Sequence, residues 1–530
     1  MSKRPLRLMI IAPIALAVAT LGALAGHATE TPRRGGTLKV IVEPEPSTLM
    51  VGLSSAASTL LVGGKIYEGL LSFDPALKAR PALAQSWAVA EDLLTYTFHL
   101  RQGVRWHDGA PFTAADVVFS IKTFLPETSP RARSIFAHVT SVQALDPYTV
   151  ELKLDQPFAP LLLGLDAYTT PILPRHLYEG SDYRKNPANE KPIGTGPFRF
   201  GEWQRGSYIK LVRNDDYWAQ GKPYLDGIDF RIIPDASSRA LAFELGEVDL
   251  IKSSDVEPFE LPRLAKLPGV QTASSLLQHY NSIVMLEVNL RSAPMNDRRF
   301  REALRRALDL DFIKNNLWLG FANVATGPIA STSPFYDPAI QRYDFDVKKA
   351  ASLLDEMGLK PGPNGYRVTL RLTPPARTEY QRLAEYIAQQ LAQIGIKVEL
   401  VRTDMAGWSQ RLGDWDFDLA LNALDNLFDP AIGVARSYVS SNIAKGNPFG
   451  NIDGYSNPTI DTLFDKATTT VKDDERRRLY REIQRVIVAD LPIVWLVEAD
   501  FPALHKAAVG NVVTSSIGIY DNFAETFLRQ

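Results

Sequence analysis

The sequence predicts an α/β protein with more than one folding unit, and three observations support this prediction. The chain has 530 residues, enough for about three or four domains of ordinary size or for two large lobes. Apolar residues make up 45% of it and charged residues 22%, which is the balance of a globular protein. Between residues 366 and 425, apolar spacings typical of strands and of helices alternate, which is the pattern of a parallel α/β unit.

The N-terminus is typical of a cleaved secretory signal peptide, which we place at residues 1–28. Lys3, Arg4 and Arg7 precede an uncharged apolar run that ends in small residues. An uncleaved membrane anchor is the alternative, since about 19 apolar residues can just span a bilayer, but Pro13 favours a processed segment. The chain has no cysteine, and a chain of this length buries enough core to need no disulfides. These features together predict a periplasmic protein.

Four segments before residue 160 have a clear local pattern. Alternation of apolar and polar residues predicts strands, whereas Leu60, Leu61 and Ile66 share one face of a predicted helix. The predicted strands are residues 36–42, 96–100 and 148–154, and the predicted helix is residues 58–71.

The clearest region runs from residue 366 to residue 425. Helical spacing joins Tyr380, Leu383 and Ile387, and Gly395 stands where a helix commonly ends in a left-handed residue. Strands alternate with helices here, which implies parallel pairing with right-handed crossovers. The predicted elements are strand 368–372, helix 377–394, strand 396–400, helix 405–412 and strand 417–424.

A further helix is predicted from residue 473 to residue 488. Leu479, Ile483 and Ile487 share its inward face, and its acidic first turn suits the positive end of the helix dipole. We interpret the basic run 476–478 as a solvated helix face. The net charge of −2 likewise argues against a nucleic-acid partner, which would require a basic surface.

The carboxyl ends of the predicted parallel strands indicate where a ligand would bind, because ligands of open α/β sheets lie beyond those ends. The loop 425–430 collects two carboxylates, an amide and an aromatic ring there, which suits a ligand with a cationic or hydrogen-bond-donating head. Two alternatives stay open: Asp429 only caps the next helix, or Asp425 is a solvated loop residue. The residues of this candidate pocket are Asp425, Asn426, Phe428 and Asp429.

The sequence carries no recognisable catalytic or metal-binding motif. None of its seven histidines is paired at the spacing of a metal site, and it has neither a G-x-S-x-G elbow nor a phosphate-binding P-loop. We therefore expect no catalytic residue, no metal and no cofactor. An exported hydrolase that uses two carboxylates remains the alternative function, and a holdase for unfolded chains is a third interpretation.

Short motifs spread over nearly the whole mature chain resemble those of the family 5 solute-binding proteins. The strongest is residues 96–117, which contains Arg-Trp-His-Asp-Gly ahead of a predicted helix start. Each motif is weak alone, but their order is specific. Members of that family are extracytoplasmic receptors of dipeptide, oligopeptide and nickel ABC importers. The other motifs are residues 35–38, 66–70, 83–87, 194–198, 213–218, 246–249, 289–290, 299–308, 395–396 and 455–458.

The resemblance implies a two-lobe periplasmic binding protein fold of type II, in the large three-domain subclass, with a hinge and a domain inserted into the first lobe. A solute would be held between the lobes, and closure about the hinge would bury it. The implied boundaries are 29–74, 180–285 and 497–530 for lobe I, 75–179 for the inserted domain, and 286–496 for lobe II.

The resemblance also implies a function, namely a monomer, peripheral to the membrane, that captures a peptide or similar small polar solute and delivers it to the transmembrane subunits of an ABC permease. Peptide-binding members hold the ligand's α-ammonium with an aspartate just before an acidic–Pro pair. From Asp425 to Pro430 the spacing is one residue longer, and Asn426 stands where that aspartate is expected. An opine, an amino-acid conjugate or a sugar derivative therefore stays open as the solute. Further residues expected to face the cleft are Asn422, Trp408, Arg436 and, on lobe I, Glu43.

Overall fold

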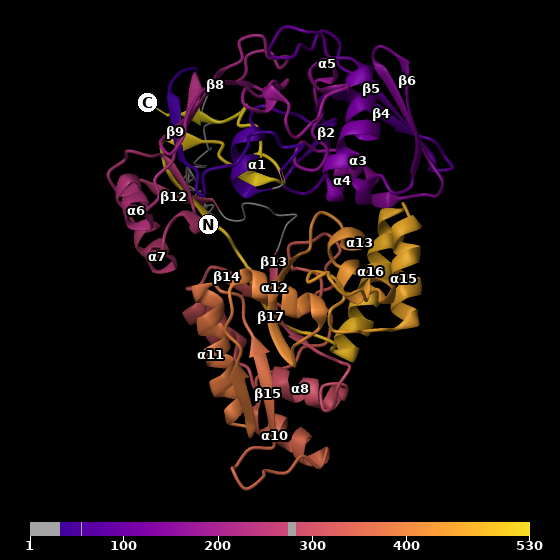
Figure 1. The fold of residues 1–530 in the computed structure, drawn as a ribbon, viewed down its shortest axis with the longest axis vertical. Coiled ribbons are helices and arrows are strands. Elements are labelled where there is room, and N and C mark those ends of the chain that lie inside the picture. The colour runs from indigo at the N-terminus through magenta and orange to yellow at the C-terminus, as the bar shows by residue number, and fades with distance from the viewer. Residues whose placement is uncertain (1–31, 55, 274–281, 530) are drawn as a thin grey trace, which may run out of the picture.

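The computed structural model describes residues 32–54, 56–273 and 282–529, which form two halves (Figure 1). We call "upper half" the described residues up to 273 together with 503–529, and "lower half" residues 282–499. The upper half holds a seven-stranded and a four-stranded sheet, and the lower half holds a six-stranded sheet. Within these described ranges, no helix has both the length and the apolar character needed to cross a membrane.

The seven-stranded sheet is built around β1 (Thr37–Ile41), which is the first strand predicted from the sequence. β1 runs parallel to β10 (Gly227–Arg231) and to β11 (Leu250–Lys252), and α6 (Ala236–Glu244) makes the crossover between those two strands. The outer strands of this sheet pair antiparallel to their inner neighbours. They are β8 (Phe198–Gln204), β9 (Tyr208–Arg213), β12 (Val270–Ala273) and β19 (Ala503–Lys506).

The four-stranded sheet is antiparallel throughout, in the order β4-β5-β7-β6. Its inner strands, β5 (Thr95–Leu100) and β7 (Thr149–Leu154), are two of the predicted strands. Leu38 of β1 and Phe98 of β5 belong to one continuous apolar cluster, so the two sheets of the upper half share a core. The other elements of this region are β4 (Ala84–Val89), β6 (Val139–Asp146), α2 (Ala114–Phe119), α3 (Leu125–Thr128) and α4 (Pro130–Ile135).

The six-stranded sheet contains the predicted parallel unit. β15 (Val368–Thr373) runs parallel to β16 (Ile396–Leu400) and to β17 (Leu419–Asp425), which confirms the prediction. A buried strand, β13 (Ser282–Val288), pairs antiparallel with β17 and was not predicted. The remaining strands and the connecting helices are β14 (Ala322–Val324), β18 (Val494–Ala499), α11 (Thr378–Ala392) and α12 (Met405–Asp414).

The two halves touch along one side of the molecule, where α13, α15 and α16 lie beneath α3 and α4 in Figure 1. Helix α15 contacts the turn at Ala159–Gly164 in the upper half. Phe428, from the lower half, belongs to the apolar cluster of the upper half. The other helices of the lower half are α8 (Arg298–Arg306), α10 (Val347–Glu356), α13 (Pro430–Gly433), α14 (Ala435–Tyr438), α15 (Pro458–Thr469) and α16 (Asp473–Asp490).

Residues 500–502 carry the chain from β18 in the lower half to β19 in the upper half. The Asp500 amide donates to the Phe321 carbonyl at 3.0 Å, and the Ser253 amide donates to the Pro502 carbonyl at 2.8 Å. This crossing is therefore anchored in both halves. The boundaries of the lobes and of the inserted domain stay a prediction.

The helix predicted over residues 58–71 is shorter in the structure. It is α1 (Ala57–Gly63), and the chain then turns beneath the C-terminal segment. A Cβ placed on Gly64 would lie 2.3 Å from the Tyr520 carbonyl oxygen, and the Lys65 ammonium donates to the Ile519 carbonyl at 2.7 Å. These long-range contacts override the local apolar spacing on which the prediction depended.

Candidate functional site

Asp425 is the last residue of β17, at the edge of the lower sheet that faces the upper half. It pairs in register with Ser282, the first residue of β13. Burial raises the pKa of the Asp425 carboxyl, while the charge of Arg436, a hydrogen bond with Ser282 and the charge of Arg131 act in the opposite direction. Arg131 belongs to α4 in the upper half, so this carboxylate lies where the two halves approach each other.

Arg436 shapes the turn that follows Asp425. Its Nη2 donates to the Asp425 carbonyl at 2.8 Å, and its Nε donates to the Gly433 carbonyl at 2.9 Å. The guanidinium thus braces the backbone of the predicted pocket and also contributes positive charge near the Asp425 carboxylate. The structure brings these two predicted site residues together.

Asn426 and Phe428 point away from open solvent. Asn426 is 7% exposed; its Oδ1 accepts from the Ala330 amide at 2.6 Å, and its Nδ2 donates to the Pro328 carbonyl at 3.1 Å. The amide therefore ties the segment 328–330 to the end of β17. Phe428 is 4% exposed and packs into the apolar cluster of the upper half. Ligand contact by either residue stays a prediction.

Asp429 has a structural role that one of the sequence alternatives included. It is 0% exposed, and it caps α13 by accepting from the Ala431 amide at 2.9 Å. Arg476 Nη2 donates to both of its carboxylate oxygens, at 2.9 and 2.7 Å, and the Tyr480 hydroxyl donates at 3.1 Å. The predicted solvated position of Arg476 is therefore wrong. This side chain is 4% exposed, and its guanidinium pairs with the buried carboxylate of Asp429.

Asn422 lies inside the lower half, beside two buried carboxyl groups. Its Nδ2 donates to Glu287 Oε1 at 3.0 Å, and Asp453 Oδ1 accepts from the Val288 amide at 2.8 Å. Burial raises the pKa of both carboxyls, and the charge of Glu287 raises that of Asp453 further. Two buried carboxyl groups this close favour protonation of one of them, and the raised pKa of Asp453 indicates that it holds the proton. Asn422 donates a hydrogen bond to the other, Glu287.

Trp408 and Glu43 lie in different surroundings from Asp425. Trp408 is 4% exposed, packs with Leu412 and Phe417, and donates its indole N–H to the Leu421 carbonyl at 3.2 Å. Glu43 follows β1 in the upper half, and its Oε2 lies 4.0 Å from Arg239 Nη1. Within the described ranges, no three His, Asp or Glu side chains gather closely enough to hold a metal ion.

Comparison with known proteins identifies the family. The model of the bacterial extracellular solute-binding proteins, family 5 (middle region), matches residues 78–446. The chain belongs to this family. The resemblance predicted from the motifs is thereby confirmed.

Individual relatives of family 5 align over most of the chain. The glutathione-binding protein GsiB of Salmonella paratyphi A is 28% identical over 467 residues, covering 84% of this chain and 85% of that protein. Heme-binding protein A of Haemophilus influenzae is 29% identical over 521 residues, covering 92% and 90%. The periplasmic binding protein DppA of Helicobacter pylori, solved with the peptide STSA, superposes with a TM-score of 0.77 at 28% identity, covering 94% of this chain and 99% of that one.

The chain is thus a non-catalytic substrate-binding protein of an ABC importer, with the α/β two-lobe fold of family 5. This membership replaces the exported hydrolase that the sequence left open. The family is extracellular, and the predicted signal peptide at residues 1–28 lies outside the described residues.

Three of the family 5 motifs, considered separately in the sequence, meet at Glu68. Its carboxylate accepts from the Thr195 hydroxyl at 2.9 Å, from the Tyr217 hydroxyl at 2.7 Å and from the Trp218 indole at 3.0 Å. These residues come from the motifs 66–70, 194–198 and 213–218. Nothing in the local sequence shows that these residues converge. The available signal was that the motifs follow one another in the order found in the family.

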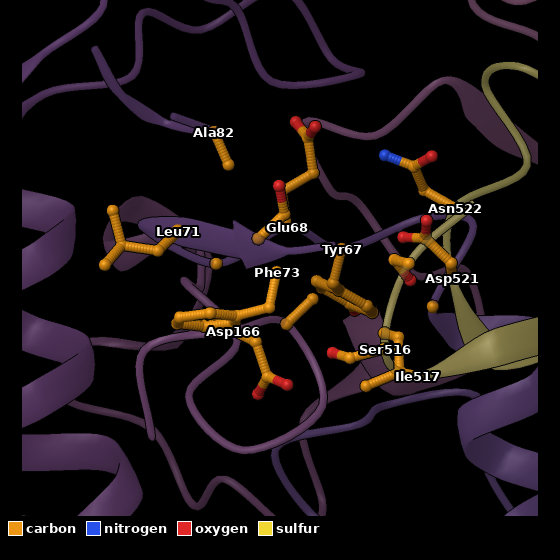
Figure 2. Close-up of a pocket in the computed structure, with 15 residues that line it drawn as sticks. Tyr67, Glu68, Leu71, Phe73, Ala82, Asp166, Ser516, Ile517, Asp521 and Asn522 are labelled. Atoms are coloured by element: carbon orange, nitrogen blue, oxygen red, sulfur yellow. The ribbon is translucent and has the colours of Figure 1, made fainter. Parts of the chain in front are cut away.

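Glu68 also lines a small cavity with Asp166 and Asp521 (Figure 2). The three acids come from separate segments of the upper half. The cavity volume is about 30 Å³, which is room for water and not for a solute. Burial raises the pKa of Glu68 to about 7 and that of Asp166 to about 6. We therefore assign this cluster to the stability of the fold and not to solute binding.

The raised pKa of Glu68 predicts a pH dependence of stability. Between its usual pKa and about 7, the folded protein holds a proton that the unfolded chain releases, so this group lowers the free energy of unfolding as pH rises through that range. In Glu68→Gln this contribution is absent. The stability of the variant relative to the wild type is expected to increase from pH 5 to pH 7.5, as measured by urea unfolding. Exposed Glu190→Gln is the control, and a pH-independent difference for Glu68→Gln would contradict the prediction.

Proposed function

We propose that this protein captures a peptide or peptide-like solute with a cationic group between its two halves. It does so in the periplasm, after removal of residues 1–28, as a monomer peripheral to the membrane, and it delivers the solute to the transmembrane subunits of an ABC permease. Relatives named for glutathione and solved with a bound peptide support this choice of solute class.

The observation that carries the proposal is the position of Asp425. Its carboxylate lies at the carboxyl end of a parallel strand, partly exposed and close to the upper half. Partial burial removes some of the water around this charge, so an ammonium group that binds between the halves gives the carboxylate an additional hydrogen-bonding partner of opposite charge. Ser282 hydrogen-bonds to this carboxylate, and the positive charge of Arg436 lies near it.

A matched pair of peptides tests this assignment. The tripeptide Ala-Ala-Ala with a free amino group is expected to bind roughly tenfold or more tightly than the N-acetylated tripeptide, because acetylation removes the cation. Titration calorimetry on the mature protein measures the difference, after native mass spectrometry has shown whether a solute co-purifies. Glutathione, an opine and a sugar derivative are titrated in parallel. Equal affinities for the two tripeptides, or binding of the neutral sugar alone, would contradict a cation-directed site.

A further inference from the structure

A second, larger cavity lies in the upper half, away from β17. It measures about 330 Å³ and is formed by the β8–β9 hairpin together with segments around His107 and Lys191. The hairpin forms the edge of the seven-stranded sheet in Figure 1. This volume falls at the lower end of the range of small-molecule pockets.

The cavity is positively charged. Arg199 and Lys191 line it, and none of its eight lining residues, all within the described chain, carries a carboxylate. Arg199 Nε is buried and has no hydrogen-bond partner among the described residues. A buried donor without an acceptor costs free energy, and a ligand acceptor that draws the Arg199 guanidinium towards the cavity would relieve that cost.

His107 adds no charge to the cavity. Its Nδ1 accepts from the Gly194 amide at 3.2 Å, and its Nε2 lies 2.9 Å from the Gly196 carbonyl, so Nε2 carries the proton. Burial lowers the pKa of this imidazole to about 4, and the charge of Arg199 acts in the same direction, whereas the hydrogen bond to the Gly196 carbonyl and the charge of Asp108 act in the opposite direction. At neutral pH the ring is uncharged and holds the turn that forms one wall.

The remaining walls are apolar. Ile193 and Phe200 line the cavity together with Val212, which is 43% exposed. A guanidinium binds a carboxylate through two parallel hydrogen bonds, whereas an ammonium such as that of Lys191 acts as a point charge. The combination of two cations, a neutral histidine and apolar walls suits an anion that has an apolar body.

We propose that this cavity binds a small organic monocarboxylate with an apolar body, with Arg199 holding the carboxylate and Ile193 and Val212 contacting the body. The site is separate from the Asp425 cleft, and its ligand carries the opposite charge. It therefore gives the protein a second ligand class, independent of the transported solute.

Saturation-transfer NMR measures the binding of phenylacetate, and of its neutral analogue phenylacetamide, to the mature protein. Phenylacetate is expected to bind saturably, and Arg199→Gln is expected to weaken it roughly tenfold or more, because the charged fork is lost. Lys191→Gln should weaken it by roughly threefold, as for an exposed charge. Lys210→Gln, on the same hairpin and with the same change of charge, should leave binding unchanged.

A second variant distinguishes loss of binding from a folding defect of Arg199→Gln. Val212→Trp fills the cavity from its half-exposed wall, keeps both cations, and should abolish phenylacetate binding while the melting temperature is retained. Competition by inorganic phosphate tests whether the cavity binds any anion or also requires the apolar body of the ligand. The proposal is overturned if phenylacetamide binds as well as phenylacetate, if Arg199→Gln binds normally, if phosphate competes as strongly as phenylacetate, or if no saturable binding occurs.

Discussion

Replacing Asp429 with alanine is expected to lower the free energy of unfolding by about 3–5 kcal/mol, the cost of leaving a buried charge without its partner. Arg476 is 4% exposed and donates to both carboxylate oxygens of Asp429. After the substitution its guanidinium keeps the Ala467 carbonyl and the Tyr480 hydroxyl but no opposite charge. The cap on α13 is lost at the same time.

Urea unfolding at neutral pH measures this loss, and two further variants define its cause. In the double variant Asp429→Ala with Arg476→Met the stranded charge is gone, so most of the lost stability should return. Asp416→Ala removes an exposed carboxylate that pairs with Arg371 and Arg411, and should cost less than about 1 kcal/mol. A loss in Asp429→Ala no larger than in Asp416→Ala would show that the buried pair is not a stabilising unit.

The substitution Asp425→Asn is expected to weaken binding of free Ala-Ala-Ala roughly a hundredfold, or about 2.8 kcal/mol at 1.4 kcal/mol per tenfold. The amide keeps the size of the side chain and the neighbouring Ser282, but it removes the charge that the ligand's ammonium would pair with. Because Asp425 is partly exposed, the fold should retain its melting temperature. Titration calorimetry gives the affinity, and thermal unfolding of the free protein checks the fold.

Glu356→Gln provides the matched control, since it neutralises an acid at the far end of α10 in the lower half. Its affinity for the peptide should equal that of the wild type. In Asp425→Asn, N-acetylation of the peptide should no longer matter, because the partner of the ammonium is gone. A persistent preference for the free amine would place the cation-binding group elsewhere in the cleft.

The sequence predicts well those elements whose pattern is local. In the 366–425 unit, Leu383, Ile387 and Leu391 form the buried face of α11, as their spacing indicates. The antiparallel insertion of β13 next to β17 could not be predicted, because it pairs residues more than a hundred positions apart. Strand order in a sheet depends on such pairings, which local periodicity does not encode.

The candidate site was predictable to the level of the loop and not of the side chain. The carboxyl end of β17 follows from the parallel unit, which placed Asp425. Which acids face the cleft depends on partners elsewhere: Asp429 meets Arg476, which looked like one of three solvated arginines, and Asn422 meets Glu287 across the sheet. In both cases the polar side chain makes a structural contact with a partner that is distant in sequence, so the sequence alone did not reveal the contact.

The crossing at residues 500–502 has a consequence for the range of any motion between the two halves. A three-residue tether with one end bonded to Phe321 and the other to Ser253 leaves few backbone torsions free to rotate. The two halves are therefore held at a high effective concentration relative to each other, and separation gains little chain entropy. The equilibrium between separated and closed halves then depends on the side chains that meet across the halves, such as Phe428 in the upper cluster. It also depends on any molecule bound between the halves.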